Sequence, residues 1–258
     1  VCIIGLGLLG LLAAQIARSA GCAVFGVDLS PDRVKLAQDL GFSASLNENC
    51  LDLVSGMTDG RGFDHVLICA DTSSDDTVLL AGQVARDRGS VVAVGAVGLD
   101  IPRKIYYEKE LNFIVSRSYG PGRYDPQYEE NGMDYPPGYV RWTEGRNLQS
   151  FVDLLASGKV DVKPLISHRF PIGDAPKAYE LITGRSKAPF LGVLLTYPNS
   201  QADEQVQRRV LNPVAGAIAT PEIRVGVLGA GNYAQAVFLP ILKKTGGTEL
   251  SGIVTASG

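Results

Sequence analysis

Short apolar runs alternate with amphipathic stretches along the first 118 residues of the chain. The apolar runs are typical of buried strands, and the stretches between them have the spacing of helices. The expected strands are 1–6, 22–28, 63–70, 89–98 and 111–118, and the expected helices are 8–20, 31–40 and 75–85. Ser30 and Pro31 mark the start of the second helix, as its N-cap and its first helical residue. This alternation predicts an α/β fold with a doubly wound parallel sheet, the Rossmann type.

The pattern changes after residue 118. Residues 119–139 are rich in Pro, Gly, Tyr and acidic residues and have no usable period, so we expect a long loop of the kind that is often functional. Thr143 then precedes an amphipathic helix. Its apolar positions are Leu148, Phe151, Val152, Leu154 and Leu155. A helix at 174–183 and a strand at 190–197 follow.

Residues 198–222 are polar, interrupted by prolines and poorly periodic, which is typical of an interdomain linker, with a short helix at 203–211. After it, "IRVGVLGAGNYAQAVFLPIL" (223–242) has the pattern of a strand, a glycine turn and the start of a helix. Residues 249–258 have the pattern of a second strand and its end. This segment predicts an incomplete second Rossmann β-α-β unit.

Composition and charge exclude several classes of protein. The 258 residues are 45% apolar and 20% charged, with a net charge of −3 and scattered Lys and Arg, so neither a nucleic-acid partner nor a basic membrane-binding face is expected. The first seventeen residues are apolar apart from Gln15, but no basic segment precedes them and Arg18 ends them early. We therefore expect no membrane span and a cytoplasmic location.

Cysteines and histidines provide no local case for a metal site. Cys2, Cys22, Cys50 and Cys69 form no CxxC pair, and small buried thiols in a reducing compartment are favoured over a disulfide framework. His65 and His168 lie far apart in the sequence, and His168 is expected to be a packed or surface histidine.

The first strand leads into the first glycine fingerprint, Gly5-Leu6-Gly7-Leu8-Leu9-Gly10. Gly5 allows the tight turn, Gly7 allows the backbone to approach a pyrophosphate, and Gly10 allows close packing of helix on strand. The helix N-terminus at Leu8 and Leu9 offers free N–H groups and a partial positive charge to the phosphates.

An acidic residue follows at the spacing that this motif requires. Asp28 ends the second strand eighteen residues after Gly10, where a carboxylate accepts hydrogen bonds from the adenosine ribose and repels a 2′-phosphate. The motif therefore predicts NAD as the cofactor, with NADP possible. Leu29, which follows Asp28, is also expected to bind the cofactor. Two roles are possible for Arg33: it flanks the adenine, or it binds a 2′-phosphate if Asp28 turns away.

The carboxyl ends of the later strands are expected to complete the cofactor pocket. Those ends carry Ala70, Gly95 and Ser116. Asp71 and Arg117 lie beside them, and their charges suit either binding or an ordinary solvated loop. The tyrosines of 119–139 either line a substrate mouth or pack within the loop. No catalytic residue is marked by the sequence.

The second glycine fingerprint is Gly229-Ala230-Gly231-Asn232-Tyr233-Ala234. Its expected cofactor-binding residues are Gly229, Gly231, Asn232 and Tyr233. Where an acid would end the second strand, the chain has Thr255, Ala256, Ser257 and Gly258, so cofactor preference at this site is open.

Positions 1–197 resemble the cofactor domain of the medium-chain, alcohol-dehydrogenase-like family, in "CIIGLGLLGLLAAQIARSAGCAVFGVDLSPDRVKLAQDLGF", "FDHVLICA", "GSVVAVG" and "HRFPIGDAPKAYELITG". In that family a barrel-like catalytic domain precedes the dinucleotide domain, carries the catalytic zinc in zinc-dependent members, and is rejoined by the chain near its C-terminus. The resemblance implies that zinc belongs only to such a preceding domain, and that no catalytic residue is carried over to this sequence. Residues 119–197 resemble the return.

The segment from residue 223 resembles a different family, the glucose–fructose oxidoreductase and inositol dehydrogenase type, through its GxGxxA turn. The order of the two resemblances is that of bacterial bi-domain oxidoreductases, which implies a chain truncated at both ends. We thus expect a Rossmann domain at 1–118, its end and the return at 119–197, a linker at 198–222 and a second Rossmann domain from 223 to 258.

Together these patterns predict part of an NAD(P)-dependent oxidoreductase. The whole protein would transfer a hydride between nicotinamide and an alcohol or a sugar carbonyl, whereas the chain itself is expected to bind cofactor without turnover. Apolar surfaces left uncovered by truncation predict a homo-oligomer. A non-catalytic, redox-sensing dinucleotide-binding module and a signal-anchored structural protein are the alternative interpretations.

Overall fold

The computed structural model describes residues 1–186, 188–198 and 223–255. The chain divides into two compact units, Val1–Pro198 and Asn199–Gly258, and each is described by itself. The expected linker at 198–222, with its short helix, lies outside the described residues except for Pro198.

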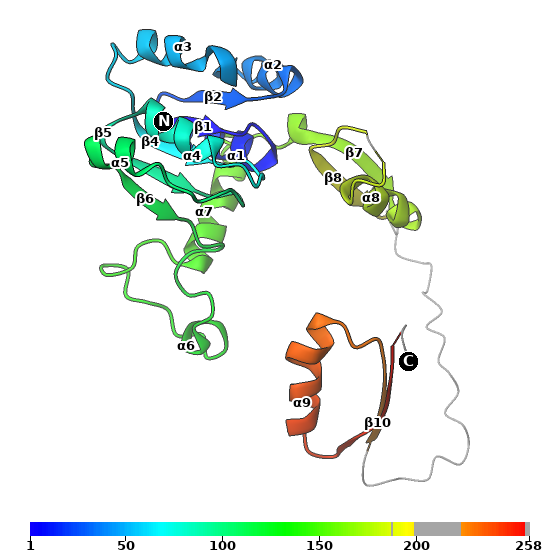
Figure 1. Ribbon diagram of the computed structural model, residues 1–258. Helices are drawn as coiled ribbons and strands as arrows, with labels where there is room; N and C mark the ends of the chain where they lie inside the picture. Colours follow the sequence, from blue (N-terminus) through cyan, green and yellow to red (C-terminus); the bar gives the residue numbers. More distant parts are fainter. Residues whose placement is uncertain (187, 199–222, 256–258) are drawn as a thin grey trace. The chain divides into compact units, whose positions relative to one another are not determined.

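A six-stranded parallel sheet forms the centre of the first unit, with strand order β3-β2-β1-β4-β5-β6 (Figure 1). Its strands are β1 (Cys2–Ile4), β2 (Phe25–Asp28), β3 (Ser43–Leu46), β4 (Phe63–Ile68), β5 (Ala85–Ala93) and β6 (Asn112–Val115). The strand order turns back on itself at β1 and β4, which is the arrangement of a doubly wound Rossmann sheet. All strands run the same way, so their carboxyl ends share one edge of the sheet.

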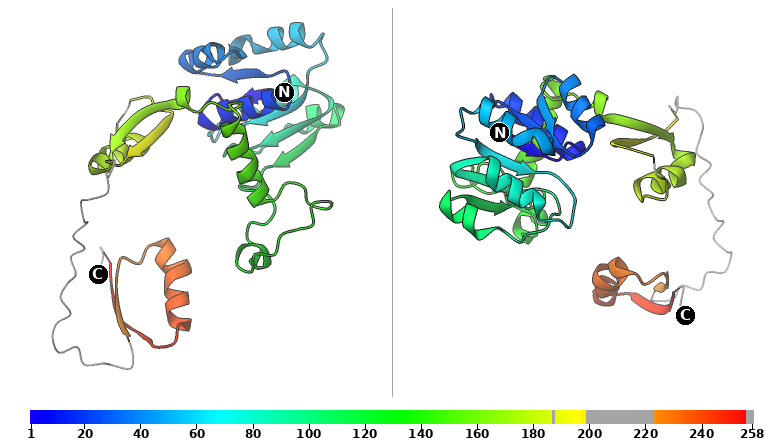
Figure 2. Two further views of the ribbon diagram at one scale, coloured as in Figure 1. Left: turned by 180° about the vertical axis from the view of Figure 1, so that it is seen from behind. Right: turned by 45° about the horizontal axis from the view of Figure 1, so that its top comes forward.

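Helices cover both faces of this sheet, as Figure 2 shows. Helices α1 (Leu8–Ser19) and α2 (Pro31–Asp39) bury their apolar side chains with Ile3 and Leu6 on one face. Helices α3 (Cys50–Met57), α4 (Asp76–Val84) and α5 (Arg103–Glu108) pack with Cys2 and Ile4 on the other. Because consecutive side chains of a strand point to opposite faces, the three-residue strand β1 supplies both cores, and it has to be apolar throughout.

Four elements of the first 118 residues differ most from the sequence prediction. Strand β5 begins at Ala85, earlier than the expected start at 89, because Ala85 already pairs with Phe63 of β4. The register then shifts, so that the next pair is His65 with Ser90, and Arg86 forms an ion pair with Asp64 at 2.7 Å. The expected strand continued to 98, but β5 ends at Ala93. Strand β3 and helices α3 and α5 were not predicted.

The rest of the first unit consists of a long excursion and a small parallel pair. Its elements are α6 (Pro126–Glu129), α7 (Glu144–Ala156), η2 (Lys163–Leu165), β7 (Ile166–Pro171), η3 (Ile172–Asp174), α8 (Ala175–Ile182) and β8 (Gly192–Thr196). Strands β7 and β8 form a two-stranded parallel sheet. The predicted helix at α7 forms, but none of its residues is buried, and Leu148 and Val152 are exposed.

Ser30, the predicted N-cap of α2, and Thr143, which was expected to precede the later helix, both occupy the N-cap position, but neither side chain makes a capping hydrogen bond. Ser30 precedes Pro31 with extended backbone, but its side chain makes no capping bond, and its N–H donates to the Asp28 carboxylate instead. Thr143 precedes α7 and is fully buried, yet its hydroxyl has no partner among the described residues.

The second unit contains one β-α-β turn. Strand β9 (Ile223–Leu228) leads through the second glycine fingerprint into the π-helical turn η4 (Ala234–Phe238) and helix α9 (Leu239–Lys244), and β10 (Thr248–Val254) returns parallel to β9. This is the strand, turn, helix and strand that the sequence predicted.

The four cysteines form no disulfide. Burial raises the pKa of the Cys2 thiol to about 12 and that of Cys69 to about 11. Two of them depart from the expectation of buried thiols, because Cys22 is exposed and Cys69 is half-buried.

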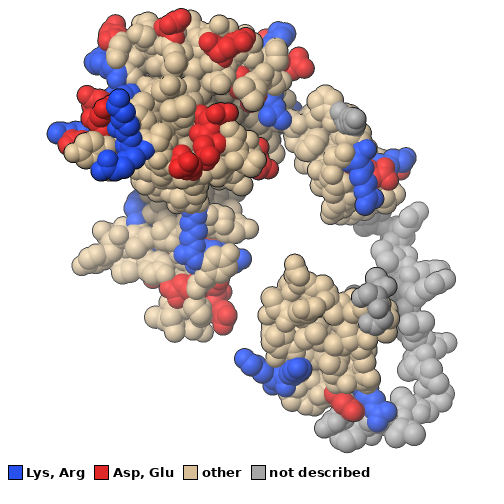
Figure 3. All heavy atoms as spheres, viewed as in Figure 1, with Lys and Arg blue, Asp and Glu red and all other residues tan. Residues whose placement is uncertain are grey.

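Surface chemistry agrees with the scattered charges of the sequence. On the face shown in Figure 3, acidic and basic side chains are interspersed. Within the described ranges, no helix combines the length and the apolar character needed to cross a bilayer.

Lys109 ties the end of α4 to the segment after α5. Its ammonium group donates to the carbonyl oxygens of Gly82 and Gln83 at 2.9 Å and of Ala85 at 2.7 Å. Hydrogen bonds from a charged donor contribute about 1.5–3 kcal/mol, so Lys109→Met is expected to lower the free energy of unfolding by about that amount. Urea unfolding measures the loss. Lys104→Met, which removes an exposed lysine from α5, should change stability by less than about 0.5 kcal/mol. Equal losses in the two variants would contradict this role of Lys109.

Candidate functional site

The first glycine fingerprint forms a tight turn between β1 and α1. Gly5 has a φ of +94°, which side chains other than glycine rarely adopt. A Cβ atom on Gly5 would lie 2.7 Å from the backbone nitrogen of Ala70 at the end of β4. The turn is fixed to β2 by a hydrogen bond from the Gly5 N–H to the Val27 carbonyl oxygen at 2.8 Å.

The other two glycines of this motif face opposite environments. A Cβ atom on Gly10 would lie 1.9 Å from the Gly5 carbonyl oxygen, so the helix can pack on the turn only without a side chain there. A Cβ atom on Gly7 would meet only the Arg33 guanidinium, at 3.9 Å. Gly7 thus leaves its backbone open to a ligand, whereas Gly10 lets α1 approach the strand.

The N-terminus of α1 is uncapped. Gly7 is the N-cap residue and offers no side-chain acceptor, so the N–H groups of Leu8, Leu9 and Gly10 have no side-chain cap. Leu8 is 37% and Leu9 57% exposed. These N–H groups and the helix dipole make the start of α1 suited to an anion.

Asp28 is the buried acid of the site, with only 8% of its surface exposed. One carboxylate oxygen accepts the Leu6 N–H at 2.6 Å and the other accepts the Ser30 N–H at 2.8 Å. Arg33, half-exposed on α2, has its guanidinium 3.8 Å from the first of these oxygens. Asp28 therefore holds the glycine turn in place and still has free acceptor capacity on each oxygen.

The glycine turn, Asp28 and Arg33 line one cavity of about 640 Å³ at the carboxyl ends of β1, β2 and β4. Its wall includes six residues expected from the sequence: Gly5, Gly7, Asp28, Leu29, Arg33 and Ala70. It also includes residues that the sequence did not mark for binding: Asn47, Thr72, Ser74, Asp76 and Thr77, together with Asp71, whose role was open. Asn47 follows the unpredicted strand β3, and recognising that strand would have placed it here.

Five residues of the first unit that the sequence predicted for cofactor binding are not among those that line this cavity: Leu8, Leu9, Gly10, Gly95 and Ser116. A Cβ atom on Gly95 would meet the Ala70 carbonyl oxygen at 1.9 Å, so Gly95 supports the cavity wall from behind. Ser116 follows β6, where its N–H donates to the Ala93 carbonyl oxygen at 2.8 Å, and it lines a second cavity beside Arg117.

The second glycine fingerprint has a similar turn in the second unit. Gly229 has a φ of +92°, and its N–H donates to the Val254 carbonyl oxygen at 2.7 Å. Apart from its chain neighbours, no atom of the described residues lies within 4 Å of a Cβ atom placed on Gly231. Asn232 and Tyr233 are exposed beside it.

Neither histidine belongs to a metal cluster. His168, on β7, stacks on Phe170 with ring centroids 6.0 Å apart, and its Nδ1 lies 2.9 Å from the Ser167 hydroxyl. His65 is exposed on β4. In the described ranges, no three His, Cys, Asp or Glu residues are grouped so that they could hold a metal ion.

Comparison with known proteins gives consistent matches. Residues 9–130 match the family described as zinc-binding dehydrogenase. A sorbitol dehydrogenase from Halalkalibacterium halodurans is 30% identical over 198 residues, covering 70% of this chain and 48% of the relative. An L-threonine 3-dehydrogenase from Bacillus licheniformis is 26% identical over 186 residues, covering 70% of this chain and 47% of the relative. The chain thus spans about half the length of these curated relatives.

Among solved structures, the alcohol dehydrogenase TADH from Thermus sp. ATN1 has a TM-score of 0.58 and 26% identity, covering 76% of this chain and 50% of that one. The fold and the glycine turn define a doubly wound domain of the dinucleotide-binding class. Residues 9–130 are thus similar to the dinucleotide-binding part of zinc-type, medium-chain alcohol dehydrogenase-like proteins.

Proposed function

We propose that the first unit binds a nicotinamide dinucleotide, NAD in preference to NADP, in the cavity of about 640 Å³. One observation carries this proposal: Gly7, the N-cap residue of the uncapped helix α1, and the buried carboxylate of Asp28 line the same cavity. In dinucleotide-binding folds, the positive N-terminus of the first helix binds the pyrophosphate, and the acid at the end of the second strand binds the adenosine ribose.

Each binding residue then has a separate role. Gly7, Leu8 and Leu9 present backbone N–H groups to the phosphates, and Asp28 accepts hydrogen bonds from the ribose hydroxyls. Leu29 and Arg33 flank the adenine. Ala70, with Gly95 behind it and Ser116 further along the edge, belongs to the nicotinamide half. When bound, the nicotinamide supplies the hydride chemistry, while these residues bind and orient it.

We propose that the whole protein is a dehydrogenase acting on an alcohol or a sugar. The names of its relatives support this, since they include sorbitol and L-threonine dehydrogenases. Catalytic residues are not assigned to this chain.

The domain boundaries are also proposals: a dinucleotide-binding domain at 1–118, its end with a return segment at 119–197, a linker at 198–222 and a second unit at 223–258. The parallel pairing of β9 with β10 around Gly229 supports a second dinucleotide-binding unit, of the kind found in fused bi-domain oxidoreductases.

A reducing, cytoplasmic location is supported by the four free thiols. A homo-oligomer is supported by the exposed Ile114 and Val115 on the edge strand β6.

Titration of the purified chain with NADH and NADPH, followed by nicotinamide fluorescence, tests the cofactor proposal. We expect saturable NADH binding and weaker NADPH binding. Absence of binding by both cofactors at millimolar concentration would show that the cavity is not a dinucleotide site.

A further inference from the structure

A second cavity, of about 630 Å³, lies where strand β6 ends. Its walls are the last residues of β6 and the segment that follows, including Arg117, Arg123, Tyr124, Asp125 and Tyr135. Residues 114–117 form one part of the cavity wall, and the other part comes from the excursion after β6, whose residues 119–139 showed no periodicity in the sequence.

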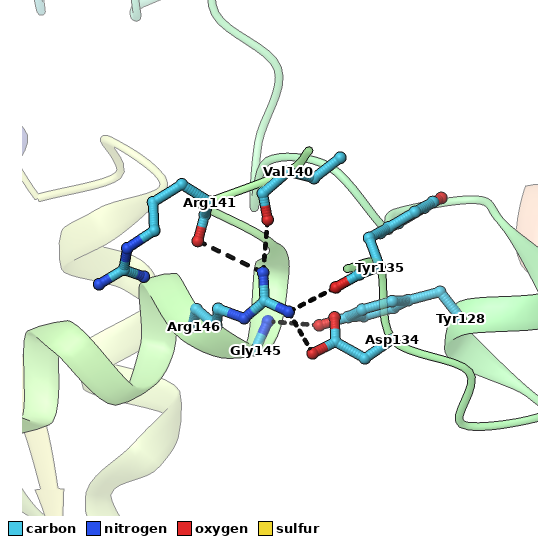
Figure 4. A network of polar contacts seen from close by, with 7 residues as sticks. All are labelled: Tyr128, Asp134, Tyr135, Val140, Arg141, Gly145 and Arg146. Atoms are coloured by element: carbon cyan, nitrogen blue, oxygen red, sulfur yellow. Dashed lines mark hydrogen bonds and ion pairs between the residues drawn. The ribbon is translucent and has the colours of Figure 1, made fainter. Parts of the chain in front are cut away.

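Polar contacts fix the shape of this excursion (Figure 4). The guanidinium of Arg146 donates to the carbonyl oxygens of Val140 at 2.5 Å and Tyr135 at 2.6 Å, and it forms an ion pair with Asp134 at 2.5 Å. Tyr128 accepts the Gly145 N–H at 2.8 Å.

Aromatic stacking continues the same wall. The Tyr128 ring stacks on that of Tyr135, with centroids 5.6 Å apart. The start of α7 thus holds the loop from behind, and the wall that carries Tyr135 is held by several independent contacts. A wall of this kind is preorganised for a ligand.

The carboxylates near the cavity are already engaged. Glu129 forms an ion pair with Arg123 at 2.5 Å and accepts the Tyr124 N–H at 3.2 Å. Asp125 accepts the Tyr135 hydroxyl and the Gln127 N–H. That hydrogen bond to Asp125 is also the main reason why the pKa of Tyr135 is raised, so Tyr135 stays a neutral hydroxyl at physiological pH.

Arg117 is the cation that these carboxylates do not neutralise. It is exposed at the cavity, and its guanidinium lies 4.7 Å from the centre of the Tyr124 ring. Within the described residues it has no carboxylate partner and its side chain donates no hydrogen bond. Arg123 lies 4.5 Å from the same ring, and its Nε is buried without an acceptor in the described part of the chain. One aromatic ring therefore contacts two guanidinium groups at the cavity. Arg123 is paired with Glu129, whereas Arg117 has no carboxylate partner in the described part of the chain, and the carboxylate that lines the cavity, Asp125, is hydrogen-bonded to Tyr135 and Gln127.

The position of this cavity relates it to the proposed cofactor site. Asp28 places the adenosine half of the dinucleotide at β1 and β2, so the nicotinamide half falls beyond β4 and β5. Strand β6 is the next strand along the same carboxyl edge. The second cavity therefore lies along the same carboxyl edge of the sheet as the expected position of the nicotinamide, where the substrate would react.

We propose that the cavity at the end of β6 binds the anionic group of the substrate, a carboxylate or a phosphate, through Arg117. The substrate class is then an acidic or phosphorylated sugar or polyol rather than a neutral alcohol. The assignment of this anion as part of a substrate rests on the proposed dehydrogenase function. The binding of an anion to the cavity can be measured without cofactor. Planar guanidinium groups bind carboxylates and phosphates with two parallel hydrogen bonds, which suits either anion.

Calorimetric titration of the 258-residue chain with glucose 6-phosphate, gluconate and glucose tests this proposal. We expect one or both anionic sugars to bind and neutral glucose to bind at least about tenfold more weakly. Binding of glucose 6-phosphate alone assigns a phosphate, and binding of gluconate alone assigns a carboxylate. Arg117→Ala should weaken anion binding by about tenfold or more, and Arg117→Lys should restore part of it.

Arg141→Ala is the matched control, because Arg141 belongs to the same excursion, stacks on Trp142 at 4.2 Å and does not line the cavity. It removes the same charge and should leave anion binding unchanged. Equal weakening by the two variants, unchanged binding in Arg117→Ala, equal affinity for glucose, or no binding of either anion at millimolar concentration would each overturn the proposal. NADH titration of the same variants separates the two ideas: if NADH fails to bind while the anion still binds through Arg117, only the dehydrogenase function is lost.

Discussion

Replacing Gly10 with alanine is expected to destabilise the first unit by about 3 kcal/mol and to abolish cofactor binding. The new Cβ would lie 1.9 Å from the Gly5 carbonyl oxygen and 3.0 Å from its carbon. Both are backbone atoms of a turn that is itself packed against Ala70, so no flexible side chain can move to relieve the contact. Helix α1 would have to move away from β1, and the Leu8 and Leu9 N–H groups would move with it.

The expected loss is large because it overrides a favourable local term. Alanine is a better helix former than glycine by about 1 kcal/mol, so a Gly→Ala change in an uncrowded helix stabilises the protein. Gly56→Ala in α3 is such a control, since a Cβ atom there would meet nothing within 4 Å. Urea unfolding should show a gain for Gly56→Ala and a loss for Gly10→Ala. A neutral or stabilising result for Gly10→Ala would show that the helix does not pack on the turn in this way.

The apolar core of this fold could be predicted from the sequence, because a strand that is buried on both faces is an uninterrupted run of apolar residues. β1 is buried at every position, and the run of apolar residues that forms it was recognisable as a strand. Strand β3 has no such run. Its sequence, SASL, has only two apolar residues, Ala44 and Leu46, which pack partly buried against the core, and four residues are too few for a clear pattern. Its place beside β2 follows from the pairing of Phe25 with Ser43. Missing β3 also meant missing Asn47 in the cavity wall.

The excursion after β6 shows a second limit of sequence patterns. Its shape comes from Arg146, which lies on α7 and donates to backbone oxygens five, six and eleven residues earlier. Carbonyl oxygens are present in every residue, so no sequence signal marks which of them an arginine will contact. The sequence therefore left the role of the tyrosines and of Arg117 open, whereas the structure places Arg117, Tyr124 and Tyr135 around one cavity.

Asp28 illustrates both a success and an omission. The spacing from the glycines identified it as the acid of the site, and it does lie in the cavity. What the sequence could not show is that both carboxylate oxygens also accept backbone N–H groups, from Leu6 and Ser30. Removing the side chain would leave two donors without partners, so Asp28→Ala would disturb the turn as well as the ribose contact.

Asp28→Asn is the sharper variant, and it is expected to weaken NADH binding by about tenfold to a hundredfold. The amide keeps the shape of the side chain and one oxygen acceptor, but it loses the negative charge and the second acceptor. The same loss should lower the free energy of unfolding by about 1–3 kcal/mol, so binding is measured under conditions where circular dichroism shows the variant to be folded. Asp39→Asn, an equal charge change at the exposed end of α2, should leave both quantities almost unchanged.

NADPH binding should respond to the same substitution in the opposite direction. The carboxylate that repels a 2′-phosphate is gone, and the Arg33 guanidinium, 3.8 Å from Asp28 in the native protein, is free to accept the phosphate. We therefore expect Asp28→Asn to bind NADPH at least as tightly as NADH, and Arg33→Ala added to it to remove that gain. If the double variant retained the NADPH affinity of Asp28→Asn, Arg33 would not be the phosphate partner. If Asp28→Asn bound NADH as tightly as the native chain, the acid at the end of β2 would hold only the glycine turn.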